Sequence, residues 1–106
     1  MPPLSEILAQ LRLNPADGRS LAELAQNFSI GERTLMRMCR RDLGVSLTEW
    51  RQRLRTIHAL PLLRSGKTVE IVARELGYGS ASAFIATFRR IIGVSPGKFC
   101  VSVKDR

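Results

Sequence analysis

The stretch that decides the fold is residues 68–96, TVEIVARELGYGSASAFIATFRRIIGVSP. Apolar residues recur at helical spacing in its first part and again in its second, and a glycine-containing turn separates the two. A basic pair, Arg89 and Arg90, stands near the end of the second part. Two short helices joined by such a turn, with cations on the second, are typical of a helix-turn-helix motif.

The same pattern occurs earlier in the chain, in residues 20–46, SLAELAQNFSIGERTLMRMCRRDLGVS. Leu24 matches Val72, 48 positions later, whereas Arg40 matches Arg89, 49 positions later. The difference of one residue falls in the turn, where an insertion disturbs the structure least. Two copies favour a domain built from a pair of motifs over a solenoid.

The composition favours an anionic partner. A chain of 106 residues forms one domain, or two very small lobes that share a helix, and 44% hydrophobic residues are enough for a core. The net charge is +8, and seven arginines lie between Arg33 and Arg55 against only Asp42 and Glu49. Arginine suits bidentate contacts with phosphate or guanine. The alternative is that these charges only keep a solvated surface soluble.

The chemistry-bearing residues do not indicate an enzyme. The chain has no paired-carboxylate motif, Ser/His/Asp set, glycine-rich phosphate loop or metal-ligand cluster, and His58 stands alone. We therefore expect neither catalysis nor a cofactor. Cys39 matches Phe88 in the repeat, which predicts a buried free thiol. The absence of a signal peptide and of a membrane-spanning apolar run predicts the cytoplasm.

Periodicity and capping residues predict an all-α fold of about seven helices. The expected helices cover residues of about 4–13, 21–27, 32–43, 47–65, 69–76 and 80–92, with a short last helix from Pro96 through Cys100. Ser20 with Glu23 and Ser46 with Glu49 form capping boxes. Lys104 to Arg106 are expected to fray.

The long helix of residues 47–65 is expected to join two lobes, about 4–46 and about 66–106, within a single domain. Its length, roughly 28 Å, approaches the roughly 34 Å between successive major grooves on one face of DNA, so it can act as a spacer. Its apolar sides are expected to carry Trp50, Leu54, Ile57, Leu60 and Leu63. Pro61 predicts a kink or an early end near His58 to Leu60.

The two second helices of the motifs differ in their exposed faces. In the helix of residues 32–43, Leu35, Met38 and Cys39 are expected to point inward, which leaves the opposite face to Arg33, Met36, Arg37 and Arg40. In the helix of residues 80–92, we expect the inward residues to be Phe84, Phe88, Ile91 and Ile92.

With both motifs and the connecting helix placed, the chain resembles the DNA-binding domain of AraC/XylS-type transcription regulators. The most specific part is the run Ile71-Val72-Ala73, Leu76-Gly77-Tyr78, Ser82-Ala83-Phe84, Phe88-Arg89-Arg90 and Gly93-Val94-Ser95-Pro96. The resemblance implies seven helices in two lobes, whose recognition helices, about 32–43 and 80–92, enter adjacent major grooves of double-stranded DNA. Such regulators usually carry an effector-sensing or dimerising domain, which is expected to be missing from this chain.

Carried over residue by residue, the resemblance places base-reading positions on Arg33, Met36 and Arg37, with Glu32 and Arg40 beside them. In the second unit these positions fall on Ala81, Ser82, Ile85 and Ala86, where only serine can hydrogen-bond to a base. We therefore expect unequal roles. The first unit is expected to read the base sequence, and the second is expected to bind mainly the phosphate backbone and to add apolar readout of A/T pairs. The expected phosphate contacts are Arg41, Arg51, Arg89, Arg90 and Lys98.

Some alternatives stay open from the sequence. Arg51, Arg53 and Arg55 are ambiguous between phosphate contact and other roles, and Arg53 could brace the two lobes. The leading function is sequence-specific DNA binding in transcription regulation. The alternatives are non-specific architectural DNA binding and a protein-interaction module that contacts RNA polymerase.

Overall fold

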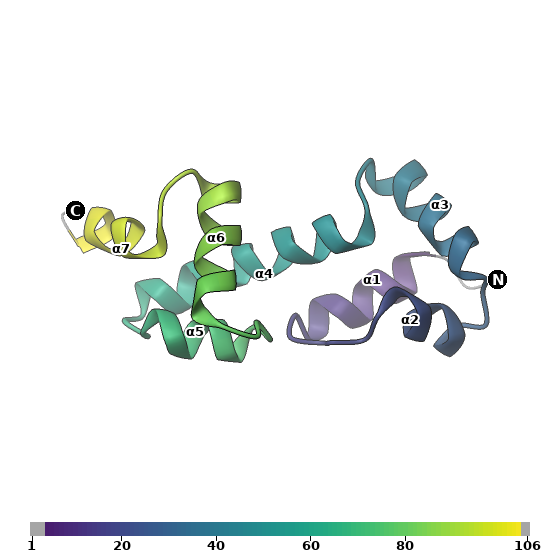
Figure 1. The fold of residues 1–106 in the computed structure, drawn as a ribbon, viewed down its shortest axis with the longest axis horizontal. Coiled ribbons are helices and arrows are strands. Elements are labelled where there is room, and N and C mark those ends of the chain that lie inside the picture. Colours follow the sequence, from purple (N-terminus) through teal and green to yellow (C-terminus); the bar gives the residue numbers. More distant parts are fainter. Residues whose placement is uncertain (1–3, 105–106) are drawn as a thin grey trace. The chain divides into compact units, whose positions relative to one another are not determined.

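The structure, a computed structural model, describes residues 4–104, with side chains to Val101. This part of the chain is all-α and contains seven helices and no strand (Figure 1). The helices are α1 (Leu4–Leu13), α2 (Leu21–Asn27), α3 (Glu32–Leu43), α4 (Leu47–Arg64), α5 (Val69–Glu75), α6 (Ala81–Ile92) and α7 (Pro96–Lys104). The expected fold class and helix order are confirmed.

Of the two outcomes predicted at Pro61, the early end is wrong, because α4 continues through Pro61 to Arg64, whereas the kink stays a prediction. Pro61 has no N–H to donate to the carbonyl of Ile57. Both residues are exposed, so water can satisfy that carbonyl, and the buried Ala59 and Leu63 on the other face hold the helix in place. The last helix also extends further than predicted, so Lys104 belongs to α7; residues 105–106 lie outside the described residues.

Packing divides the chain into two compact units, with the boundary between Arg51 and Gln52 inside α4. The first unit holds α1, α2, α3 and the start of α4. Helix α3 packs against both α1 and α2. The buried apolar residues of this unit are Leu4, Ile7, Leu8, Leu11, Leu24, Ala25, Leu35, Met38, Cys39 and Leu47. Within the helices these residues recur at helical spacing, so the apolar pattern of the sequence marks the core residues of this unit.

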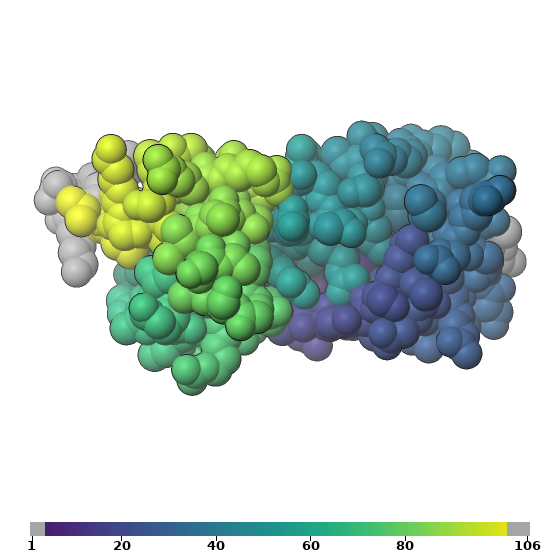
Figure 2. All heavy atoms as spheres, in the orientation of Figure 1, coloured from purple at the N-terminus to yellow at the C-terminus, as the bar shows by residue number. Residues whose placement is uncertain are grey.

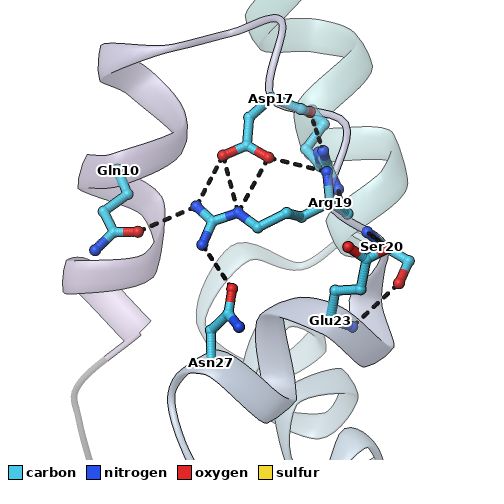
Figure 3. A network of polar contacts seen from close by, with 7 residues as sticks. Gln10, Asp17, Arg19, Ser20, Glu23 and Asn27 are labelled. Carbon is cyan, nitrogen blue, oxygen red and sulfur yellow. Dashed lines mark hydrogen bonds and ion pairs between the residues drawn. The ribbon is translucent and has the colours of Figure 1, made fainter.

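Arg19 organises the connection between α1 and α2 (Figure 3). Its guanidinium lies 2.7 Å from Asp17 Oδ2, and it also donates to Gln10 of α1 (3.1 Å) and Asn27 of α2 (2.9 Å). The hydrogen bond from Arg19 lowers the pKa of the largely buried Asp17 carboxyl below its ordinary value. Arg51 of α4 donates to the backbone carbonyls of Asp17 and Arg19, so a loop rich in helix breakers is held in one conformation.

The second unit is built around aromatic rings. Ring centroids lie 5.3 Å apart for Tyr78 and Phe84, 5.7 Å for Phe84 and Phe88, and 5.8 Å for Phe88 and Phe99. These separations and the tilted or edge-on geometry are those that aromatic pairs prefer. Around the rings, Ala59, Leu63, Val72, Ala73 and Leu76 are buried, which joins α4, α5 and α6 in one cluster.

The turn between the two helices of each motif is the same structure twice. In the first, Ser29 N–H donates to Gln26 O (3.1 Å), and Ile30 N–H donates to Ala25 O (2.9 Å). In the second, Gly77 N–H donates to Arg74 O (3.1 Å), and Tyr78 N–H donates to Ala73 O (2.9 Å). Ile30 and Tyr78, which make equivalent hydrogen bonds, are 48 positions apart, whereas the N-cap residues Gly31 and Ser80 are 49 apart. The extra residue of the second motif is therefore Gly79, between Tyr78 and Ser80.

Two residues predicted to face inward do not. Ile57 is 62% exposed, and Ile92 lies at the exposed end of α6. The core position next to Ile57 is taken by Thr56, which is fully buried and whose hydroxyl donates to Gln52 O at 2.8 Å. A threonine that satisfies its hydroxyl within its own helix can replace an apolar residue, and apolar periodicity does not detect it.

Replacing Asp17 by Asn should destabilise the first unit at neutral pH by about 1–3 kcal/mol, because a charge-assisted hydrogen bond is lost. A carboxyl whose pKa is lowered by folding stabilises the protein above its unfolded pKa. Its contribution is therefore complete above pH 3.8 and is lost as pH falls through the lower folded pKa. Urea unfolding at neutral pH and in steps below pH 3.8 should show the difference between wild type and Asp17→Asn shrinking. The matched control is Asp42→Asn, in an exposed pair, which should change stability little at any pH.

Gly77 has φ +80°, whereas Ser29, its counterpart, holds the same left-handed region at φ +55° without being glycine. Gly77→Ser should therefore destabilise the protein by about 1–2 kcal/mol. The reciprocal Ser29→Gly relieves backbone strain, but glycine loses more conformational entropy on folding, which costs about 0.5–1 kcal/mol. The net effect of Ser29→Gly on stability should therefore be small. Thermal unfolding followed by circular dichroism measures both, and equal effects of the two substitutions would contradict the shared turn geometry.

Candidate nucleic-acid interface

Helix α3 presents one face to the core and the other to solvent. Leu35, Met38 and Cys39 are buried. The predicted reading residues of α3 are all exposed. They are Glu32, Arg33, Met36, Arg37 and Arg40, and Met36 is 52% exposed. The 12-residue helix ends at Gly44 in the left-handed conformation (φ +74°). The expected division of α3 into two faces is confirmed.

The arginines on this face are available for a ligand. Within the described residues 4–104, Arg33, Arg37 and Arg40 make no hydrogen bond or ion pair. Arg41 differs, because its Nε lies 2.8 Å from Asp42 Oδ1, and this hydrogen bond lowers the pKa of Asp42. Arg41 is still 72% exposed, so it can exchange this surface partner for a phosphate.

Helix α6 has the same design with different chemistry. At the spacing of 49, Ser82, Ile85, Ala86 and Arg89 stand where α3 has Arg33, Met36, Arg37 and Arg40. All four are exposed, Ile85 at 37%, whereas Ala81 is half-buried and is the least accessible of the predicted reading residues. Atoms of α6 form part of the surface visible in Figure 2. A shallow hollow on α6 is lined by Ser82, Ile85, Ala86, Arg89 and Arg90.

The cations around α6 are arranged in two ways. Arg89 is exposed and without a polar partner among the residues that the structure describes, and with Lys98 it lines a small hollow at the start of α7. Ser95 caps that helix by accepting from Lys98 N–H at 3.1 Å. Arg90 is exposed too, but its Nη2 donates to Gln52 Oε1 at 2.7 Å. Arg89 and Lys98 thus offer their full charge, whereas Arg90 is also oriented by α4.

Comparison with known proteins decides the family. The model of the helix-turn-helix domain family matches residues 24–100. The chain is 36% identical over 98 residues to the HTH-type transcriptional regulator NimR of Escherichia coli K12, and 36% identical over 86 residues to RipA of Corynebacterium glutamicum. These matches cover 92% and 81% of this chain. The chain belongs to the AraC-type helix-turn-helix domains.

Solved structures of DNA-binding transcription regulators have the same fold. The DNA-binding domain of AdpA, crystallised with a target DNA, matches with a TM-score of 0.92 and 27% identity over 100% of this chain and 96% of that one. A DNA-binding transcriptional dual regulator from Escherichia coli K-12 matches with a TM-score of 0.85 and 25% identity, with the same coverage. The family is one of transcription regulators, not of enzymes. The chain spans 36% and 26% of the lengths of NimR and RipA.

Of the three ambiguous arginines of this AraC-type domain, two have internal roles. Arg51, assigned to phosphate from the sequence, is half-buried and donates to the carbonyls of Asp17 and Arg19, so its guanidinium is turned into the first unit. Arg55 is half-buried and lies over the Tyr78 ring, 5.5 Å from its centroid. Arg53 is the exposed member of the three. These internal hydrogen bonds make Arg51 a weaker candidate for phosphate contact than the exposed Arg53.

Sequence reasoning missed Gln52 as the partner of Arg90. The two residues are 38 positions apart, and neither has a pattern that marks the pair.

The prediction from sequence that the Cys39 thiol is free and buried is confirmed, and burial raises the pKa of that thiol. His58 is exposed. Among residues 4–104, no group of three or more His, Cys, Asp or Glu side chains is placed to hold a metal, and no helix is both long and apolar enough to cross a membrane.

Proposed function

We propose that this AraC-type domain binds double-stranded DNA with α3 as the main reader of base sequence and α6 as the main grip on the phosphate backbone. The observation that carries the proposal is the exposed face of α3, where Arg33 and Arg37 stand one turn apart without internal partners. The family and the likeness to AdpA, a domain crystallised on its target DNA, support the same partner.

The side chains of α3 suit the edges of base pairs in a major groove. Arginine donates two hydrogen bonds to O6 and N7 of guanine, and glutamate accepts from N4 of cytosine. Arg33, Arg37 and Glu32 can therefore recognise G·C pairs, while Arg40 lies one turn further along the same face. Met36 between them offers an apolar contact to a base. The first half-site is expected to contain guanine.

The second unit is expected to bind mainly through charge. Arg89, Arg90 and Lys98 are exposed cations near the end of α6 and the start of α7, and Arg41 at the end of α3 is a further candidate for phosphate contact. Phosphate contacts position a protein on the duplex without reading sequence. Each cation that neutralises a phosphate releases a counterion from the DNA, so the affinity falls as the salt concentration rises. We propose that two linked units place α3 and α6 in adjacent major grooves.

The role of this chain within a whole regulator is also a proposal. Because its relatives are longer, we propose that an effector-sensing or dimerising domain and a contact with RNA polymerase complete the function. The chromosome is the working place of such a regulator, which puts the protein in the bacterial cytoplasm with the nucleoid.

The apolar face of α6 favours a second candidate function, non-specific architectural DNA binding, because Ala86 cannot hydrogen-bond to a base. Selection of bound sequences from a random duplex pool, followed by competition against random DNA, separates the two. A specific regulator should prefer its selected site by about a thousandfold or more. Equal binding to selected and random duplexes would leave only the architectural function.

Arg37→Ala should weaken binding to the selected site by about 1–3 kcal/mol and relax base preference at one position, because a bidentate contact is lost. Fluorescence anisotropy on the selected duplex and on its single-base variants measures both effects. Arg74→Ala on α5 is the control, since it removes the same charge from an exposed position outside both recognition helices. The assignment fails if Arg74→Ala changes base preference as much as Arg37→Ala does.

Arg89→Ala should weaken binding to all sequences alike and reduce the slope of log affinity against log salt by about 1, as expected for one lost phosphate contact. Titrations over a series of salt concentrations, on selected and random duplexes, provide the measurement. A change in base preference with an unaltered slope would instead place Arg89 on a base edge.

A further inference from the structure

We propose that α6 adds sequence selectivity of its own by contacting the C5 methyl groups of thymine, with Ile85 as the central contact and Ala86 beside it. This inference rests on the proposed function, because it requires α6 to lie in a major groove. It assigns a ligand chemistry to a face on which Ser82 is the only one of the predicted base-reading residues with a hydrogen-bonding side chain.

The apolar character recurs at one position of the repeat. Met36 of α3 and Ile85 of α6 are 49 positions apart, and both are large hydrophobic side chains exposed to solvent, at 52% and 37%. Each lies on the exposed face of its helix, among the other predicted reading residues. Their neighbours differ, because Met36 lies between Arg33 and Arg37, whereas Ile85 lies between Ser82 and Ala86.

The hollow on α6 has the charge pattern of a groove-facing surface. Ile85 and Ala86 form its apolar part, and Arg89 and Arg90 border it on the C-terminal side. A protein partner with an apolar surface would not need two arginines at the border, whereas a duplex presents phosphates beside its base edges. The cationic border therefore favours DNA as the occupant.

In a major groove, the methyl group of thymine is the apolar feature among hydrogen-bonding atoms. Ile85 and Ala86 have no side-chain donor or acceptor, so a polar base edge placed against them loses water and gains no partner. A methyl group placed there loses nothing and buries apolar area. Positions opposite Ile85 should thus favour thymine and disfavour the polar edge of a G·C pair.

The two neighbouring side chains sharpen this expectation. Ser82 can donate or accept, so it tolerates any base and adds little discrimination. Ile85 is β-branched and strongly prefers one χ1 rotamer in a helix, so its methyl groups have a defined position. Met36 is unbranched and adaptable, so the counterpart on α3 should respond less to loss of one methyl group.

Deoxyuridine tests the contact, because it differs from thymidine only in lacking the C5 methyl group. The half-site of α6 is the half of the selected duplex whose base preference Arg37→Ala leaves unchanged. Single thymine-to-deoxyuridine replacements there should weaken wild-type binding by about fourfold at one or two positions, as expected for burial of one methyl-sized group. Replacements in the flanking duplex, outside the footprint, provide the control and should change nothing.

The protein side of the cycle is Ile85→Ala and Ile85→Val, with folding checked by circular dichroism. At the position where deoxyuridine weakens wild-type binding most, Ile85→Ala should bind the thymidine and deoxyuridine duplexes equally, and Ile85→Val should retain part of the difference. The inference is overturned if wild type does not distinguish the two duplexes, or if Ile85→Ala still distinguishes them. If a variant is unstable, the comparison of thymidine and deoxyuridine duplexes with the wild-type protein still tests the methyl contact.

A 7-deazaguanine replacement in the other half-site separates this inference from the proposed function. It removes the N7 acceptor that an α3 arginine needs. Sensitivity to 7-deazaguanine without sensitivity to deoxyuridine would leave α3 as a reader and remove only the methyl contact. Insensitivity to both, with no preference over random duplex, would overturn the proposed function itself.

Discussion

Burial of one face of each recognition helix is the constraint on which the rest of the structure depends. In α3, the core takes Leu35 and Cys39, and in α6 it takes Phe84 and Phe88. A helix has 3.6 residues per turn, so packing one stripe against the first helix of the motif turns the opposite stripe to solvent. The stripe that remains on α3 contains Arg33 and Arg37. The exposed face of α3 is thus set by what the core excludes.

The two motifs keep one scaffold and differ in the chemistry of their exposed faces. The turn hydrogen bonds are the same in both, and both recognition helices end at a left-handed glycine, Gly44 and Gly93. Yet the core of the first unit is aliphatic around Leu24 and Leu35, whereas aromatic rings fill the second. Backbone geometry depends on the turn and caps, which leaves the surface positions free to change.

Arginine serves two purposes in this chain, and the distinction matters for function. Arg19 and Arg51 are tied to carboxylate, amide and carbonyl oxygens in the first unit, so they maintain a loop. Arg33, Arg37 and Arg89 have no polar partner within residues 4–104, so they are available to a ligand. A high net charge alone cannot separate these groups, because both contribute equally to it.

The sequence by itself determined the seven helices, the duplication, the turn that absorbs the extra residue and the exposed face of α3. These follow from local periodicity, caps and glycines, whose effects act within a few residues. Tertiary structure alone decided that Pro61 stays inside α4, that Thr56 rather than Ile57 is buried, that Arg51 turns inward and that Arg90 meets Gln52. Each of these depends on which face of a helix meets the core or on partners more than thirty positions away, and nothing in the local pattern encodes them.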